Sequence, residues 1–288
     1  MTRRTRKRLL ITCLITLVLA GVTVSQFPEI GAALILHPPH RRVTAPPPPL
    51  CHEVTFQGDG APLRGWRGHA SGNHRGTLIY LHGVADNRAG GAGVINRFQK
   101  RGFDVIAYDS RAHGESGGDA CTYGYFEKED LRRVLDTVRP GPVVLVGSSL
   151  GAAVALQLTG TDERVSAVVA AEPFSDLRTV VTERAPFFFT STVIGKAIEL
   201  AGHEGRFLVD SVSPEAAARA IMVPTLVIHG AADTDTPPDH ARRVFAALGG
   251  PKRLILVPGA GHNESLQGTM WAEIERWIDE VLASEPHE

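Results

Sequence analysis

Short apolar runs alternate with helical patterns along most of this 288-residue chain. The runs include TLIYLHG, FDVIAYD, PVVLVG, PTLVIHG and KRLILVPG, and the segments between them have amphipathic spacing, as in YFEKEDLRRVLDTV. Strands that alternate with helices predict an α/β fold with a mostly parallel sheet and helices on both faces. Before them, Gly58-Asp59-Gly60 joins HEVTFQ to PLRGWRGH and predicts a β-hairpin.

The chain divides into three parts by composition. Residues 1–27 combine a basic cluster with the apolar stretch LLITCLITLVLAGVTV, which is typical of a targeting or anchoring segment. Residues 28–50 contain the runs HPPHRR and PPPP, which predict a semi-rigid linker, with packing along the domain surface as the alternative. Residues 51–288 form the predicted folded domain, because this length suits one large α/β domain.

The N-terminal segment predicts a single membrane span. Its charge-free part covers residues 9–24, and Ser25, Gln26 and Phe27 extend it toward the roughly twenty residues that a bilayer requires. The basic cluster predicts a cytoplasmic N-terminus, with the folded domain outside the cytoplasm. The alternative is a cleaved signal peptide and a secreted domain, since Thr23-Val24-Ser25 offers a weak cleavage site.

Charge and cysteine content exclude several classes of partner. The formal net charge of −1 provides no field for binding nucleic acid. We expect no cofactor and no metal, because the chain has neither a cysteine–histidine cluster nor a nucleotide-binding glycine loop followed by lysine. Cys51 and Cys121 are left either as free thiols or as one disulfide, and the oligomeric state is left open.

The stretch Gly147-Ser148-Ser149-Leu150-Gly151 lies where a predicted strand turns into a helix. A tight turn alone would explain the glycines. The G-x-S-x-G pattern in this context also predicts a nucleophile elbow that exposes the Ser149 hydroxyl at the carboxyl edge of the sheet.

A serine nucleophile requires a base and an orienting acid. Asp233 follows the strand PTLVIHG, and His262 follows the last strand, so both belong to the same edge as Ser149. We therefore predict the triad Ser149, Asp233 and His262, with Asp235 as the rival acid.

Two backbone amides are the expected oxyanion donors. The Leu150 amide opens the helix after the nucleophile, and the Val84 amide lies in the loop after an early strand. His82, two residues before Val84, is expected to order that turn.

A long insertion separates two strands of the predicted sheet. Residues 174–221 would form a short helical lid over the crevice. Within it, Phe187, Phe188 and Phe189 are predicted to line an acyl-binding pocket, and the alternative is that they pack the insertion onto the body.

The motifs YLHG, YDSRAHGES, GSSLG, HGAADTDTP and GAGH resemble those of the α/β-hydrolase superfamily in order and spacing. The chain is similar to its bacterial, often membrane-anchored serine aminopeptidase-like and Bem46-like members. The resemblance implies Ser149 as nucleophile, Asp233 as acid and His262 as base. It also implies that Arg111, His113 and Glu115 order the loop beside the active site. Leu150 stands where the family more often has methionine.

Three function classes follow from these motifs. We expect a serine hydrolase that cleaves a carboxylic ester or thioester through an acyl-enzyme on Ser149, with a small-molecule or lipid-like acyl substrate. A peptidase or amidase with the same triad is the alternative. It would demand more of His262, because amide leaving groups need stronger protonation than alcohols or thiols. A non-catalytic, membrane-anchored binding module is the third class, and the intact triad argues against it.

Overall fold

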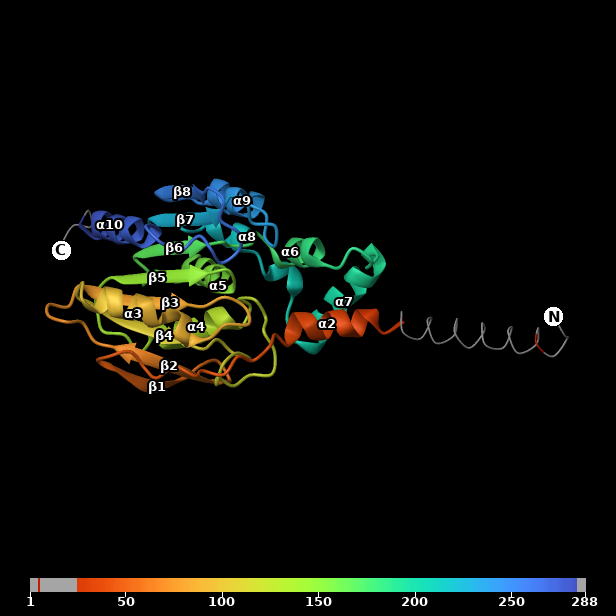
Figure 1. The fold of residues 1–288 in the computed structure, drawn as a ribbon, viewed down its shortest axis with the longest axis horizontal. Coiled ribbons are helices and arrows are strands. Elements are labelled where there is room, and N and C mark those ends of the chain that lie inside the picture. Colours follow the sequence, from red (N-terminus) through yellow and green to blue (C-terminus); the bar gives the residue numbers. More distant parts are fainter. Residues whose placement is uncertain (1–4, 6–24, 284–288) are drawn as a thin grey trace.

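The computed structural model describes residue 5 and residues 25–283, with a single sheet at its centre (Figure 1). Over this range the sheet has eight strands in the order β1-β2-β4-β3-β5-β6-β7-β8. Their bounds are β1 Cys51–Gln57, β2 Pro62–Gly68, β3 Gly76–Leu81, β4 Phe103–Tyr108, β5 Val143–Ser148, β6 Ala167–Ala171, β7 Thr225–Gly230 and β8 Lys252–Val257. The β1–β2 and β2–β4 pairs are antiparallel, and all the others are parallel.

Helices cover both faces of the sheet. Their side chains belong to two separate buried clusters, one on each face. One face carries α3 Ala92–Gln99, which follows the short helix η1 Arg88–Gly91, and α10 Met270–Ala283. The other carries α4 Glu127–Leu135, α5 Leu150–Thr159, α8 Pro214–Ala218 and α9 Asp239–Ala247. The prediction of a mostly parallel sheet with helices on both faces is confirmed.

The central strands consist of apolar runs because both of their faces are buried. Every residue of β3, β4, β5, β6 and β7 is buried, as expected for parallel strands between two helical layers. The hairpin predicted at Gly58-Asp59-Gly60 forms β1 and β2, which pair from Cys51–Gly68 to Gln57–Pro62. This rigid sheet fixes the positions of the loops at its carboxyl edge.

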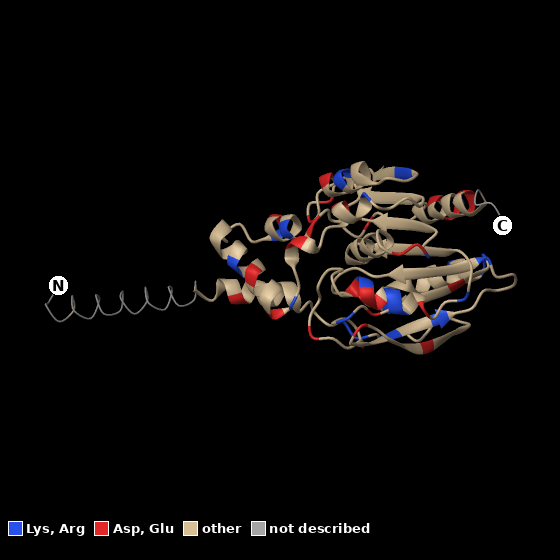
Figure 2. Ribbon diagram, turned by 180° about the vertical axis from the view of Figure 1, so that it is seen from behind, with Lys and Arg blue, Asp and Glu red and all other residues tan. Residues whose placement is uncertain are grey.

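Charged side chains of both signs are interspersed over the domain (Figure 2). Many of them form ion pairs, such as Arg132 with Asp162 at 2.8 Å and the buried Arg88 with Asp109. This pairing agrees with the small formal net charge of −1.

The predicted lid is a helical layer beyond the carboxyl end of β5 (Figure 1). It contains α6 Leu177–Arg184, α7 Ser191–Glu204 and the short helix η2 Val209–Ser211, and α8 ends the insertion. These segments have a buried cluster of their own, which reaches the body through Ala153 of α5. The lid therefore rests directly above the helix that follows Ser149.

The first part of the predicted linker is helical. Helix α2, Phe27–Leu36, packs along α7, so the extended segment begins only at His37. Its buried residues Gly31, Ala32 and Ile35 recur at helical spacing, and Pro28 occupies the first turn, where proline is tolerated. The HPPHRR and PPPP runs, on which the linker prediction rested, begin only after this helix.

The predicted span at residues 9–24 lies outside the described residues. Within the described part, no helix has both the length and the apolar character needed to cross a bilayer.

Candidate active site

Ser149 occupies a strained turn between β5 and α5. Its backbone has φ 50° and ψ −110°, a conformation that non-glycine residues rarely adopt. The flanking glycines make room for this turn. A Cβ on Gly147 would lie 2.3 Å from the Gly151 carbonyl oxygen, and a Cβ on Gly151 would lie 2.1 Å from that of Leu81. The sequence pattern therefore forms the nucleophile elbow for a steric reason.

The structure brings the three predicted triad residues together. The Ser149 Oγ lies 3.0 Å from His262 Nε2, and His262 Nδ1 lies 2.7 Å from Asp233 Oδ2. In the tautomer that fits both contacts, Nδ1–H donates to Asp233 and Nε2 accepts the serine hydroxyl. This is the arrangement of a nucleophile, a base and an orienting acid.

Asp233 is held as an anion by several donors. Burial opposes its ionisation, but hydrogen bonds from His229, His262 and the Thr236 amide outweigh burial and hold its pKa well below the usual range. His229 Nε2 lies 3.2 Å from the same Oδ2 that contacts His262. The rival acid Asp235 has an exposed side chain, and its amide donates to Asp233 Oδ1. The geometry therefore favours Asp233 as the acid.

The predicted oxyanion donors lie on either side of the nucleophile. A Cβ built on Gly83, the residue before Val84, would be 3.6 Å from the Ser149 Cβ, so this loop runs past the elbow. Leu150 is the first residue of α5. Within residues 25–283, neither the Val84 nor the Leu150 amide donates a hydrogen bond to another protein group. Both are free to bind a developing oxyanion.

Two histidines whose rings pack edge to face support the oxyanion loop. His82 is fully buried, its Nδ1–H donates to the Gly83 carbonyl oxygen at 2.7 Å, and its Nε2 accepts from the Ser110 amide at 2.9 Å. Burial lowers the pKa of His82 and keeps the ring neutral. The His113 ring lies 5.2 Å from it, and burial lowers the pKa of His113 to about 4. His82 thus orders the turn, as predicted from its position.

The other two residues implied by the resemblance brace neighbouring segments. Arg111 donates to both oxygens of Asp130 on α4, at 2.7 and 2.8 Å. Glu115 pairs with Arg88 of η1. Both therefore hold the loop after β4 in place, and neither contacts the triad.

Glu172 is a positioning residue that the sequence analysis missed. It lies at the end of β6 with φ 54°, it is 1 % exposed, and its carboxylate accepts the amides of Asn263 at 2.8 Å and Ser265 at 3.0 Å. These two bonds hold the loop that carries His262. The sequence could have indicated this role, because it places an acidic residue directly after the apolar run SAVVAA, at the end of a predicted strand.

Arg184 is the second residue that sequence reasoning missed. It comes from the end of α6 in the lid, and its Nη2 lies 3.3 Å from His262 Nε2. Its Nε donates to the Asp235 carbonyl oxygen at 2.9 Å. The lid therefore reaches the base of the triad directly. No spacing in the sequence indicates this contact, because it depends on how the lid docks.

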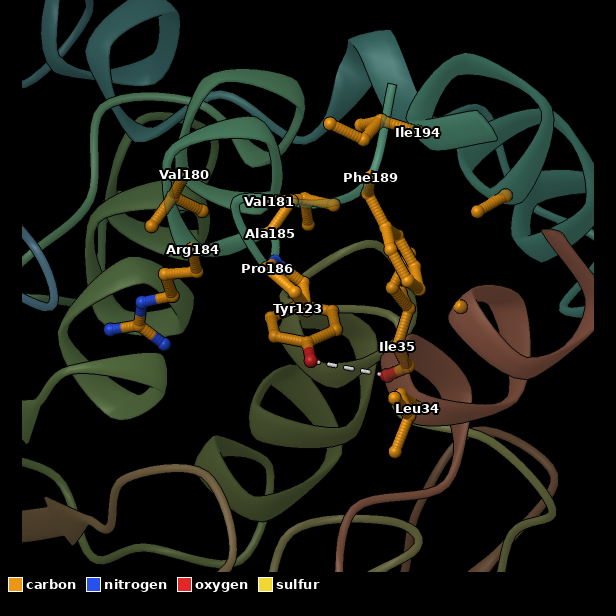
Figure 3. Close-up of a pocket in the computed structure, with 12 residues that line it drawn as sticks. Leu34, Ile35, Tyr123, Val180, Val181, Arg184, Ala185, Pro186, Phe189 and Ile194 are labelled. Carbon is orange, nitrogen blue, oxygen red and sulfur yellow. Dashed lines mark hydrogen bonds between the residues drawn. The ribbon is translucent and has the colours of Figure 1, made fainter. Parts of the chain in front are cut away.

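An apolar cavity of about 190 Å³ lies between the lid and α2 (Figure 3). Arg184 is its single charged lining residue, so the cavity adjoins the triad through this side chain. The lining consists of Gly31, Leu34, Ile35, Tyr123, Val180, Val181, Arg184, Ala185, Pro186, Phe189, Ile194 and Ala197. This mostly apolar lining is suited to binding an acyl chain.

The structure differs from the pocket prediction for two of the three phenylalanines. Phe189 lines the cavity and stacks on Phe27 with ring centroids 5.1 Å apart. Phe187 and Phe188 do not line it and are 99 % and 58 % exposed. The reason is the tight turn after Pro186, whose carbonyl oxygen accepts the Phe189 amide at 2.8 Å, because consecutive side chains on a turn diverge.

A second, more polar cavity of about 460 Å³ borders the oxyanion loop. Gly83, Val84 and Ser148 line it together with charged side chains such as Asp86 and Arg97. It shares no lining residue with the apolar cavity. The site thus offers an apolar and a polar compartment near the same nucleophile.

The remaining reactive side chains stay apart from this site. Cys51 and Cys121 are both free thiols, one half-buried in β1 and the other buried after β4. Within the described part of the chain, no group of three or more His, Cys, Asp or Glu side chains is arranged to hold a metal ion.

Several known proteins are similar to this chain in sequence. The α/β-hydrolase fold model matches residues 76–200. The uncharacterised protein YfhR of Escherichia coli (strain K12) is 28 % identical over 264 residues, which cover 85 % of this chain and 86 % of YfhR. Protein bem46 of Schizosaccharomyces pombe is 25 % identical over 210 residues, which cover 69 % of this chain and 66 % of bem46.

Two solved structures have the same fold. The Pyrococcus furiosus esterase Pf2001 has a TM-score of 0.68 and 23 % identity, with coverage of 86 % of this chain and 97 % of the esterase. The Pyrococcus horikoshii acylaminoacyl peptidase has a TM-score of 0.65 and 13 % identity, with coverage of 83 % of this chain and 42 % of the peptidase. Together with the elbow, the strand order and the motifs, the matching fold model and the similarity to bem46 and YfhR support an α/β-hydrolase of the Bem46-like kind.

Proposed function

We propose that this protein is a serine hydrolase that cleaves a carboxylic ester or thioester through an acyl-enzyme on Ser149. The observation that supports this most strongly is the chain of contacts from Ser149 Oγ to His262 and on to Asp233, at 3.0 and 2.7 Å. The hydrolase family supports the same general chemistry.

Acylation begins with attack of Ser149 Oγ on the substrate carbonyl carbon. The hydroxyl proton moves to His262 Nε2, and the buried Asp233 carboxylate stabilises the imidazolium that forms. The carbonyl oxygen becomes an oxyanion that accepts hydrogen bonds from the Val84 and Leu150 amides. The proton on Nε2 then passes to the departing alkoxide or thiolate, and the acyl group remains on Ser149.

Deacylation repeats these steps with water. His262 Nε2 takes a proton from a water molecule as its oxygen attacks the acyl carbon. The second tetrahedral intermediate collapses, the Ser149 oxygen recovers the proton from Nε2, and the carboxylic acid leaves. The Arg184 guanidinium, whose Nη2 lies 3.3 Å from Nε2, borders the position at which this proton is transferred.

The two cavities support an ester with an apolar acyl group. The acyl chain would occupy the cavity beside Phe189 and Ile35, and the alcohol or thiol would face the polar cavity beside Val84. A peptidase or amidase would use the same triad, but its amine leaving group requires fuller protonation by His262.

A panel of p-nitrophenyl esters of increasing chain length, measured beside aminoacyl anilides, tests this proposal. We expect hydrolysis of the esters, with kcat/KM rising roughly fourfold per added carbon until the cavity is full, because each buried methylene contributes about 0.8 kcal/mol. Phe189→Ala should flatten this dependence and leave the rate on the acetate ester unchanged. Phe187→Ala is the matched control, because this side chain is 99 % exposed and should not alter the profile for esters dissolved in water without a membrane.

Two outcomes would contradict parts of this account. Faster turnover of anilides than of esters would assign the triad to a peptidase or amidase. Equal losses by Phe189→Ala on short and long esters, together with a lower melting temperature, would make Phe189 a packing residue only.

We also propose that residues 9–24 anchor the enzyme in a membrane, with the N-terminus in the cytoplasm and the catalytic domain outside it. The apolar stretch behind the basic cluster supports this topology. Secretion after cleavage is the alternative.

A further inference from the structure

The tip of the lid exposes apolar side chains that nothing in the described chain covers. Among residues 25–283, seven large apolar side chains are exposed, and four of them lie on α2 or on the turn between α6 and α7. We call these four the apolar tip: Ile30, Leu34, Phe187 and Phe188, which are 47 %, 69 %, 99 % and 58 % exposed.

The apolar tip is one surface and not four scattered residues. Phe187 and Phe188 pack edge to face at 5.4 Å, and the Phe188 ring lies 6.3 Å from Phe27 of α2. Ile30 and Leu34 follow Phe27 at helical spacing, so they extend the surface along α2. A contiguous exposed apolar surface in a folded protein usually marks a binding surface, because burying aromatic side chains away from water is favourable.

The surroundings of the apolar tip match the interior of a bilayer. Residues 185–195, which contain the turn, include no Lys, Arg, Asp or Glu, and this turn is free of charged colours in Figure 2. Glu29 is the single charged residue of α2. The apolar segment of the sequence ends at residue 24, three positions before α2 begins. A bilayer that holds this segment lies next to the apolar tip.

The apolar cavity extends from this surface to Arg184. Leu34 belongs both to the apolar tip and to the cavity wall, and Arg184 lines the cavity elsewhere (Figure 3). The Arg184 Nη2 in turn lies 3.3 Å from His262 Nε2 of the triad. Helix α2 is a fixed part of the wall, because the Tyr123 hydroxyl donates to the Ile35 carbonyl oxygen at 3.1 Å. A Cβ on Gly31 would lie 2.8 Å from the Ala197 Cβ, so α2 and α7 cross closely there.

From these observations we propose that the apolar tip inserts into the lipid bilayer that holds the N-terminal segment, and that acyl chains enter the cavity directly from that bilayer. The delivery step rests on the proposed ester hydrolysis, whereas insertion does not. The substrate class is then a membrane-resident acyl ester. Helix α2 serves both as the connection to the anchor and as a wall of the acyl site.

Quenching of tryptophan fluorescence by brominated lipid tests insertion. The full-length chain, with Phe187→Trp, is reconstituted in phosphatidylcholine vesicles with or without bromine on the acyl chains. Met222→Trp is the matched control. Met222 is 68 % exposed, but it lies just before β7, at the amino-terminal ends of the parallel strands and away from the lid. After subtraction of the native tryptophan signal, brominated chains should quench the residue at 187 and leave the one at 222 unchanged. Equal responses of the two variants would overturn the proposal.

Hydrolysis by Phe187→Ser/Phe188→Ser protein in the same vesicles tests delivery. We expect turnover of a vesicle-embedded p-nitrophenyl palmitate to fall about fivefold or more, while water-soluble p-nitrophenyl acetate is cleaved at the wild-type rate. Equal rates on the embedded ester would overturn delivery. If the wild-type protein itself did not hydrolyse p-nitrophenyl acetate, the proposed function would be refuted, whereas the quenching result would still stand. If the wild-type protein were a dimer and the Phe187→Ser/Phe188→Ser protein a monomer, and if brominated lipid did not quench the residue at 187, the apolar tip would bind a second copy of this chain. That result would contradict the proposal.

Discussion

Replacement of Ser149 by alanine is expected to lower kcat/KM for p-nitrophenyl acetate by about 10⁴-fold or more. Alanine removes the oxygen that attacks the ester, and its methyl group fits the space that the flanking glycines leave. The residual rate would come from the oxyanion amides and from substrate binding. Initial rates measured with purified protein across a substrate series give the comparison.

Ser148→Ala is the matched control for this variant. Ser148 is the last residue of β5 and lines the polar cavity, but its hydroxyl has no contact with His262. We expect a loss of less than about tenfold, because binding contacts of one neutral hydroxyl contribute about 1 kcal/mol. If Ser149→Ala protein with an unchanged melting temperature kept most of its activity, or if Ser148→Ala were the more damaging change, Ser149 would not be the nucleophile.

Replacement of Asp233 by asparagine is expected to lower kcat by about 10⁴-fold. The asparagine amide would donate toward His262 Nδ1 and so favour the tautomer that carries its proton on Nε2. That tautomer cannot accept the proton of Ser149. The neutral amide also fails to stabilise the imidazolium, which the anionic Asp233 does at 2.7 Å.

Two further variants separate the acid from its neighbours. Asp235→Asn should change kcat less than about tenfold, because its side chain is exposed and no hydrogen bond joins it to His262. Glu172→Gln should fall between the two, because a glutamine keeps one acceptor oxygen for the two amides of the His262 loop. A larger loss in Asp235→Asn than in Asp233→Asn would transfer the role of the acid to Asp235.

The sequence alone predicts the sheet and the triad well, and the reason is local. Each of the strands β3 to β7 is an apolar run bounded by loop residues, and parallel strands bring their carboxyl ends to one edge. Ser149, Asp233 and His262 follow the parallel strands β5, β7 and β8, so their convergence is a consequence of topology. The strained φ of Ser149 follows from the glycines on either side.

The lid contacts could not be predicted, because they depend on docking between distant segments. Nothing local in the sequence indicates that α2 packs along α7, or that Arg184 reaches His262 across 78 positions. The sequence does not distinguish the three consecutive phenylalanines from one another, yet the turn after Pro186 directs only Phe189 into the cavity. Helix α2 was not predicted, because the proline runs that follow it indicate an extended segment.

The central claim is that Ser149 forms a covalent acyl-enzyme with the help of His262. The most direct measurement is mass spectrometry of the protein after reaction with a fluorophosphonate probe, which bonds to an activated serine. The account predicts a single adduct on the peptide that contains Ser149, in wild type and in Ser148→Ala, and its loss in Ser149→Ala and His262→Ala. An adduct on Ser148, or the absence of any adduct on folded wild-type protein, would contradict it.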